Sequence, residues 1–147
     1  MKKIAFIVLK IIFVIALLFA VKFIFNSPKD TRNITYKNAT SDLIVADLPF
    51  PDAVTGKEFS VIGKARGYWF FEASFPVQVL DKNGNILATG VAQAQSDWMT
   101  ENFVPFKADI KIPESYIGPA TLILKKDNPS GLLENDASIS FPITIEY

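Results

Sequence analysis

The 147-residue sequence contains no histidine and no cysteine, and this limits the chemistry that it can perform. Without an imidazole the commonest general base for a hydroxyl nucleophile such as Ser96, Thr100 or Ser130 is missing, and Lys126 near Ser130 in the sequence is a spacing common by chance. No thiolate is available as a nucleophile or zinc ligand. Glu134 and Asp136 form a carboxylate pair, but two acids in one solvated loop are weak grounds for glycoside hydrolysis. We therefore expect a protein that is not an enzyme and that holds no cofactor and no catalytic metal.

One short stretch resembles the start of a calcium-binding loop. Asp81, Asn83 and Asn85 alternate along the chain as the first ligands of such a loop do. Ile86 and Ala92 then stand where the loop needs a glycine and a bidentate glutamate. An Asn-Gly turn between two strands is the better interpretation of this stretch.

A second polar stretch, residues 126–136, is richer in oxygen-bearing side chains. The candidates are Asp127, Asn128, Glu134, Asn135 and Asp136, with Asp97 from another loop. A hard cation such as calcium needs six to eight oxygen ligands, which this set supplies only with backbone carbonyls. The alternative is that these side chains cap their own turns around Pro129, as Asn and Asp often do. Calcium binding stays open here as the second interpretation.

Arg66 and Glu72 flank a run of four aromatic residues. An arginine and a carboxylate at this spacing form either a ligand-binding pair or a structural ion pair that fixes the entry to a strand. We favour the structural ion pair.

The aromatic run itself, residues 68–71, has two faces if its side chains alternate. Trp69 and Phe71 are then expected in the core, and Tyr68 and Phe70 are expected to face outward. Outward aromatic rings can stack on sugars or on a partner protein, or they can be covered by a neighbouring loop.

These residues must be positioned by β-strands, because apolar residues recur with period 2 and no helical period is sustained after residue 42. Gly, Pro, Asn and Asp separate the runs. About seven strands are predicted, at residues 43–47, 58–65, 70–80, 86–93, 103–112, 120–125 and 138–147. We therefore predict an all-β domain of the immunoglobulin-like β-sandwich type, with a small barrel as the rival. The predicted core comprises Trp69, Phe71, Phe75, Val104, Phe106, Leu122, Leu124, Phe141 and Ile143.

Two features qualify this strand pattern. Pro76 lies inside the third predicted strand and removes a hydrogen-bond donor, so we expect an edge position or a bulge there. Residues 93–102 are polar apart from Trp98 and Met99, and we expect them to form a long connection between the two sheets.

The N-terminal 25 residues hold 21 apolar positions. The run 4–25, interrupted only by Lys10 and Lys22, is long enough to cross a membrane as a helix of about 30 Å. No small-residue cleavage motif follows it, so we favour an uncleaved signal anchor over a cleaved signal peptide. Lys2, Lys3 and the amino terminus favour a cytoplasmic N-terminus. Residues 1–25 are thus predicted to be a single-pass transmembrane helix, residues 26–42 a polar linker, and residues 43–147 an extracytoplasmic domain.

The formal net charge of zero conceals an uneven distribution. Residues 1–42 carry seven Lys or Arg and two acids, whereas residues 43–147 carry eight Lys or Arg and thirteen acids. The predicted domain is therefore acidic, and we do not expect nucleic acid as its partner.

Three separated motifs resemble one known family. They are GKARGYWFFEA at 63–73, DWMT at 97–100 followed by FVPF at 103–106, and KDNPSG at 126–131 followed by ENDAS at 134–138. In this order they resemble the Gmad family, the immunoglobulin-like domain of bacterial spore germination proteins. Leu133 departs from the pattern, because a proline is expected before Glu134. The resemblance implies an immunoglobulin-like fold over about residues 43–147 and a bacterial envelope setting, and it does not imply a defined activity or sporulation.

Together these observations predict a membrane-anchored, non-catalytic module for protein interaction or scaffolding in the bacterial cell envelope. The membrane is contacted through residues 4–25, the partner is an unidentified envelope protein, and no small-molecule substrate is expected. The alternatives are an envelope glycan-binding module that uses exposed aromatics and a calcium-stabilised surface domain. The candidate interaction surface comprises Arg66, Tyr68, Phe70, Asp97, Trp98, Met99, Asp127, Asn128, Pro129, Glu134, Asn135 and Asp136.

Overall fold

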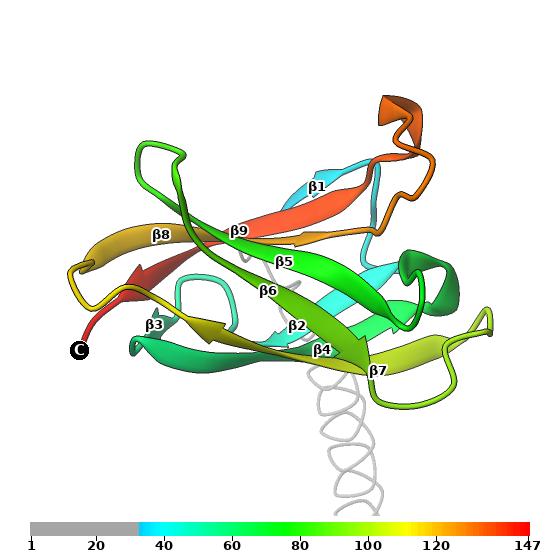
Figure 1. Cartoon of the computed structure of the whole chain (residues 1–147), viewed down its shortest axis with the longest axis horizontal. Coiled ribbons are helices and arrows are strands. Elements are labelled where there is room, and N and C mark those ends of the chain that lie inside the picture. The colour runs from blue at the N-terminus through cyan, green and yellow to red at the C-terminus, as the bar shows by residue number, and fades with distance from the viewer. Residues whose placement is uncertain (1–32) are drawn as a thin grey trace, which may run out of the picture. The chain divides into compact units, whose positions relative to one another are not determined.

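The computed structural model describes residues 33–147, which form a curled β-structure (Figure 1). The predicted transmembrane segment and residues 26–32 of the predicted linker lie outside the described residues. Within the described part, no helix has the length and apolar character that a membrane span requires.

The described residues form nine strands and two short 3₁₀ helices. The strands are β1 (Thr35–Lys37), β2 (Ile44–Leu48), β3 (Val54–Thr55), β4 (Glu58–Arg66), β5 (Ser74–Asp81), β6 (Ile86–Ala94), β7 (Phe103–Lys111), β8 (Gly118–Lys125) and β9 (Ser138–Ile145), and the 3₁₀ helices are η1 (Gly67–Trp69) and η2 (Leu133–Asn135). All seven predicted strands are present, and the short strands β1 and β3 are additional. Because β1 pairs with β9, part of the predicted linker belongs to the domain.

The strands follow the order β1-β9-β8-β5-β6-β7-β4-β2. Neighbours in this order are antiparallel, and β3 lies beside β9 in parallel. β6 pairs along its length with β5 but meets β7 through only Gln93 and Ala94, so the sheet folds over into two layers there. β1 and β2 end the order without pairing to each other, so the described strands make an open sandwich and not the rival barrel.

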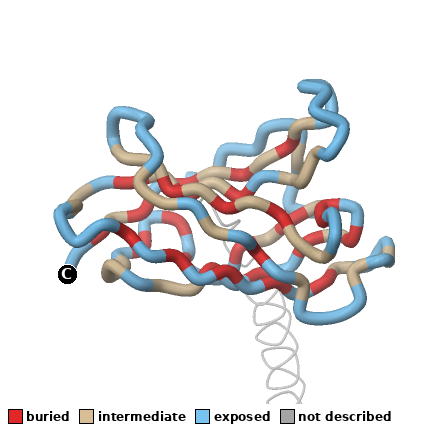
Figure 2. The backbone as a smooth tube through the Cα atoms, viewed as in Figure 1, coloured by how far each residue is buried: buried red, intermediate tan, exposed pale blue. Residues whose placement is uncertain are grey.

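Buried residues alternate with exposed ones along the strands of both layers (Figure 2), and the buried apolar side chains form one core. The ring of Phe75 lies near the centre and makes edge contacts with three other rings. Its centroid is 6.5 Å from that of Trp69, 5.2 Å from that of Phe70 and 4.9 Å from that of Phe106. Every predicted core residue is buried except Phe71. Apolar packing between the layers is thus the main source of stability in a domain without a disulfide.

The predicted facing of the aromatic run is wrong at two positions. Phe70 is only 4% exposed and Phe71 is 43% exposed, the reverse of the prediction. The cause is η1, because a 3₁₀ turn rotates successive side chains by about 120° and so lets the adjacent residues Trp69 and Phe70 both reach the core. β5 begins only at Ser74, after Glu72 and Ala73 with φ of 49° and 62°.

Pro76 lies neither on an edge strand nor at a bulge, but one side of β5 is unpaired at this position. β5 lies between β8 and β6, and the register shift in its pairing with β6 comes later, between Val79 and Leu80. Pro76 pairs with Val91 of β6, but the pairs with β8 begin only at Val77. The proline is tolerated because it precedes the ladder on that side of the strand.

The turn between β5 and β6 is the hairpin turn that the sequence predicts. The Asp81 carboxylate accepts hydrogen bonds from the backbone N–H of Asn83 at 2.7 Å, and from the backbone and side chain of Asn85 at 2.8 and 2.9 Å. Gly84 adopts a φ of +85°, which glycine reaches without steric cost. The carboxylate that resembled a calcium ligand therefore organises the turn.

Candidate functional site

Three connections meet at the end of the sandwich away from the C-terminus, and we call this region the loop end (Figure 1). They are residues 67–73, which include η1, residues 95–102 between β6 and β7, and residues 126–137 between β8 and β9. Backbone hydrogen bonds join them: Gly67 N–H donates to the Asn102 carbonyl at 3.3 Å, and Asp127 N–H donates to the Trp69 carbonyl at 3.1 Å. Residues far apart in sequence are thus held on one surface.

Gly67 allows the first two of these connections to approach each other. A Cβ atom at this position would lie 1.9 Å from the carbonyl oxygen of Thr100 and 2.2 Å from that of Trp98. Both distances are far inside van der Waals contact, and backbone atoms cannot rotate away as a side chain can. The close packing of residues 95–102 on η1 therefore requires glycine.

Arg66 fixes the same region from the end of β4. Its Nε donates to the Asp42 carbonyl at 2.9 Å, its Nη1 donates to the Glu101 carbonyl at 3.3 Å, and its guanidinium lies 4.1 Å from the ring centroid of Phe103. The expected ion pair with Glu72 is absent from the ion pairs of the described residues. The predicted ion pair is therefore wrong, and Arg66 instead contacts two backbone carbonyls and an aromatic ring.

Beside Arg66 the surface is hollowed by an open depression of about 420 Å³. Its lining residues are Asp42, Leu43, Arg66, Tyr68, Glu101 and Asn102. Of this set, only Arg66 and Tyr68 were predicted from the sequence. The other residues come from the β1–β2 and β6–β7 connections, which only the tertiary fold brings to β4.

In the β6–β7 connection the three candidate residues have different roles. The Asp97 carboxylate accepts the backbone N–H of Met99 at 3.0 Å and so caps a turn. Trp98 is partly buried against the core, whereas Met99 is 77% exposed. Met99 is therefore the side chain that this connection presents to solvent.

The β8–β9 connection is organised by its own side chains. Asn128 Nδ2 donates to the Leu132 carbonyl and to Asp136 Oδ1, both at 2.8 Å, and Asn128 Oδ1 accepts the Ser130 hydroxyl at 2.5 Å. Asn135 Nδ2 donates to Ser130 Oγ at 3.0 Å. These contacts support the turn-capping interpretation, because Asn128 and Asp136, two of the side chains proposed for calcium, use an oxygen within the loop.

The remaining candidates of this connection lie at its surface. Pro129, Glu134 and Asn135 are exposed, and Asp127 is half-buried. Among residues 33–147, no group of three or more Asp, Glu, His or Cys side chains is placed to hold a metal ion. The calcium interpretation gains no support from this geometry.

Apolar side chains are exposed on all three connections of the loop end. They are Tyr68 at 52%, Phe71 at 43%, Met99 at 77%, Leu132 at 54% and Leu133 at 81%. Leu133, at the position where the resemblance predicts a proline, begins η2. Phe71, Leu132 and Leu133 are not among the surface residues predicted from the sequence, although two consecutive leucines in an otherwise polar loop indicate an exposed apolar patch.

The aromatic platform proposed for glycan binding is smaller in the structure than the sequence suggests. Phe70 is buried and Trp98 is partly buried against the core, so Tyr68 is the one exposed ring of the three. The glycan hypothesis therefore loses two of its three stacking residues.

An open, two-layered antiparallel sandwich whose loops gather at one end belongs to the immunoglobulin-like class of domains. Residues 43–131 match the family model of the immunoglobulin-like domain of bacterial spore germination, and the chain belongs to this family. The resemblance read from the sequence motifs is thereby confirmed. η2 and β9 follow the matched range but complete the same sandwich. Comparisons with curated proteins and with solved structures found no match.

Proposed function

We propose that this chain is a non-catalytic, membrane-anchored module that binds another protein of the bacterial cell envelope through its loop end. The observation that carries the proposal is the set of exposed apolar side chains on three connections that hydrogen bonds hold together. Apolar and aromatic side chains held in place by the backbone are typical of the centre of protein interfaces. The immunoglobulin-like family supports the same function, because sandwich domains commonly present binding residues on their loops.

The binding surface is best tested with the two most exposed apolar residues of the loop end. A double variant, Met99→Asp with Leu133→Asp, places charge on the proposed contact without touching the core. Loss of co-purifying envelope proteins from this variant is the expected result, because an interface centre excludes unpaired charge. The matched control is Val54→Asp with Ile117→Asp, two similarly exposed residues at the opposite end of the sandwich. Equal loss in both variants, or retention in both, would contradict the proposed surface.

The membrane anchor and its orientation are tested separately. Alkaline carbonate washing of bacterial membranes should leave the protein in the pellet, because an apolar segment of 22 residues resists extraction. Protease added outside intact spheroplasts should digest the domain. Release into the wash contradicts the anchor, and protection of the domain contradicts the orientation.

The non-catalytic part of the proposal depends on the side-chain inventory, which lacks imidazole and thiol groups. Incubation of the purified chain with peptidoglycan and with peptide substrates should give no turnover above the uncatalysed rate. Hydrolysis that a single carboxylate substitution abolishes would show that this assignment is wrong.

A further inference from the structure

The outer face of the layer formed by β9, β8, β5 and β6 carries almost no charge. We call it the low-charge face, and its members are the outward-facing residues of these four strands. They are Ser138, Ser140, Pro142, Thr144, Pro119, Thr121, Ile123, Lys125, Ser74, Pro76, Gln78, Leu80, Ile86, Thr89, Val91 and Gln93. Lys125 is the single charged side chain among them, and it lies at one end. The short edge strand β1, beside β9, adds Lys37 next to Ser138 at the same end.

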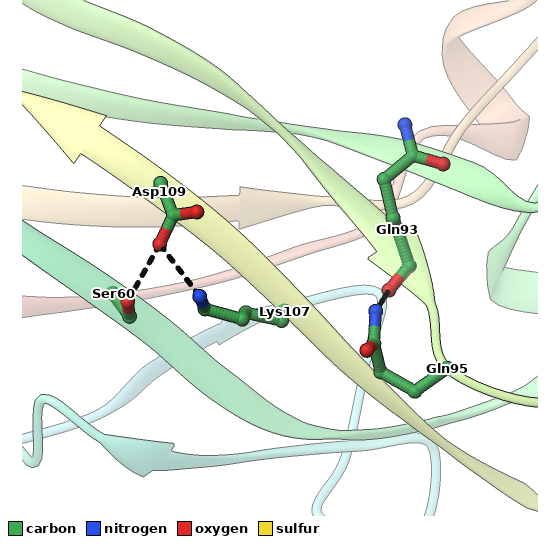
Figure 3. Close-up of polar contacts among 5 residues, drawn as sticks. All are labelled: Ser60, Gln93, Gln95, Lys107 and Asp109. Carbon is green, nitrogen blue, oxygen red and sulfur yellow. Dashed lines mark hydrogen bonds and ion pairs between the residues drawn. The ribbon is translucent and has the colours of Figure 1, made fainter.

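The outer face of the other layer is different. Its outward residues on β4 and β7 include Glu58, Lys64, Lys107, Asp109 and Lys111. Figure 3 shows the Asp109 carboxylate between the Ser60 hydroxyl at 2.6 Å and the Lys107 ammonium at 3.2 Å. Glu58 and Lys111 form a second pair at 2.7 Å. Hydrated charges therefore cover one face of the sandwich and are almost missing from the other.

The low-charge face has the composition of a surface that another protein covers. On β6, Val91 is 53% exposed and Ile86 is 59% exposed. Leu80 on β5 and Ile123 on β8 are half-buried. Depletion of charge is the feature that distinguishes the centre of an interface from ordinary surface. Ser, Thr and Gln side chains on this face can exchange hydrogen bonds with similar groups at little desolvation cost.

The size of the face suits a small interface. Strands of eight residues at about 3.4 Å per residue are about 27 Å long, and four of them cover about 19 Å in width. The flat footprint is about 500 Å², which is smaller than the area of about 800 Å² per partner that typical stable complexes bury.

Charge placement selects a second copy of this chain as the occupant. Lys125 ends β8 at the side of the face where β9 begins, and exposed Glu146 follows the end of β9 at the opposite side. A two-fold axis that lies in the interface and runs across the strands reverses the strand direction of the second copy. Lys125 of each copy then lies over the end of the other copy's face that bears Glu146. Two faces of low charge are brought together, and like charges are kept apart.

We propose that the chain forms a two-fold symmetric homodimer by packing the low-charge faces of two copies against each other with antiparallel strands. This surface is separate from the loop end, so the dimer and the proposed envelope interaction stand or fall independently. Each dimer presents two loop ends that point in opposite directions along the strands.

The chain contains no cysteine, so single cysteines can be introduced without competing thiols. Thr121→Cys lies near the centre of the low-charge face, where the two-fold axis brings a residue close to its own counterpart. A short bis-maleimide should convert the full chain carrying Thr121→Cys into a covalent dimer of two 16.3 kDa chains. The matched control is Asp109→Cys on the charged face, which should give at least about tenfold less dimer. Equal yields from both positions would overturn the proposal.

Charge insertion distinguishes this dimer from other contacts. Adding Val91→Glu to the Thr121→Cys chain should lower the yield of dimer by about tenfold, because unpaired carboxylates are buried. Ile62→Glu, on the charged face, should leave the yield unchanged. Lys125→Glu alone and Glu146→Lys alone should each lower the yield of dimer. The variant that carries both changes should restore it, because the opposite charges face each other again. Cross-linking of the Thr121→Cys chain to a different protein, or to no protein at all, would overturn the proposed homodimer. Neither result bears on the proposed interaction of the loop end.

Discussion

Trp69 illustrates how a single residue controls the interior of this sandwich. It is fully buried and its ring contacts the edge of Phe75, but its indole Nε1 has no hydrogen-bond partner. We expect Trp69→Ala to lower the free energy of unfolding by about 3 to 5 kcal/mol, because it leaves a cavity between the layers. Trp69→Phe should cost much less, because it keeps most of the apolar volume and removes an unsatisfied donor. Denaturant titration followed by circular dichroism compares the variants, and an unchanged midpoint for Trp69→Ala would exclude a core role.

Gly67 is the second residue whose identity the packing dictates. Gly67→Ala should lower the free energy of unfolding by about 1 to 3 kcal/mol, because the new methyl group overlaps two backbone carbonyls of the β6–β7 connection. The substitution should also speed up hydrogen exchange more in residues 98–102 than in β8. The comparison variant is Gly84→Ala, where no atom lies within 4 Å and only the positive φ is penalised. If Gly67→Ala left exchange in the connection unchanged, the close approach would not be needed.

The turn between β5 and β6 is an element whose stability depends on pH. Hydrogen bonds from the Asn85 side chain, and then from the backbone N–H groups of Asn85, Asn83 and Gly84, lower the pKa of Asp81 below its ordinary value of 3.8. A carboxylate whose pKa is lower in the folded state stabilises the fold above its unfolded pKa and loses this contribution as the pH falls through the folded pKa.

In the Asp81→Asn variant, the free energy of unfolding should therefore fall less steeply below about pH 4 than in the wild type. The acid-sensitive contributions of the other carboxylates should remain. Glu58, whose pKa is lowered by its hydrogen bond and charge interaction with Lys111, titrates in the same acid range. Glu58→Gln is thus the comparison variant for a carboxylate outside the turn. Thermal melting between about pH 2.5 and pH 7 measures both, and identical acid limbs for Asp81→Asn and wild type would contradict the linkage.

The β8–β9 connection is an element that the amide of Asn128 holds together. Asn128→Ala removes hydrogen bonds to the Leu132 carbonyl, Asp136 and Ser130. We expect faster hydrogen exchange in residues 130–136 with little change in melting temperature, because the core does not depend on this loop. Asn83→Ala, in the other polar turn, should leave exchange in residues 130–136 unchanged. A large fall in melting temperature for Asn128→Ala would show that the loop stabilises the sandwich itself.

At the scale of the whole molecule, the described residues 33–147 form one compact unit. This unit contains a closed set of buried apolar side chains drawn from both layers. A chain that begins at residue 33 should therefore fold with a single cooperative transition. Circular dichroism and calorimetry test this expectation, and a broad transition without a defined midpoint would contradict it.

Seven of the nine strands in the described residues, most of the core and the family could be predicted from the sequence. Alternation at period 2 is a local property, so β4, β7, β8 and β9 could be read directly from the positions of their apolar residues. Turn chemistry is equally local, which explains why the Asp81 turn was predicted correctly. Three motifs in the expected order were enough to indicate the family that the match over residues 43–131 establishes.

The tertiary structure alone decided which residues share a surface. The facing of Phe70 and Phe71 depended on η1, which begins at Gly67, where a connection distant in sequence packs closely. The partners of Arg66 are backbone carbonyls, which carry no side-chain signal in a sequence. The low-charge face joins strands that are separated along the chain, so its uniform composition appears only when β9, β8, β5 and β6 lie side by side. Periodicity reports how one strand meets its surroundings, whereas a surface depends on contacts between strands.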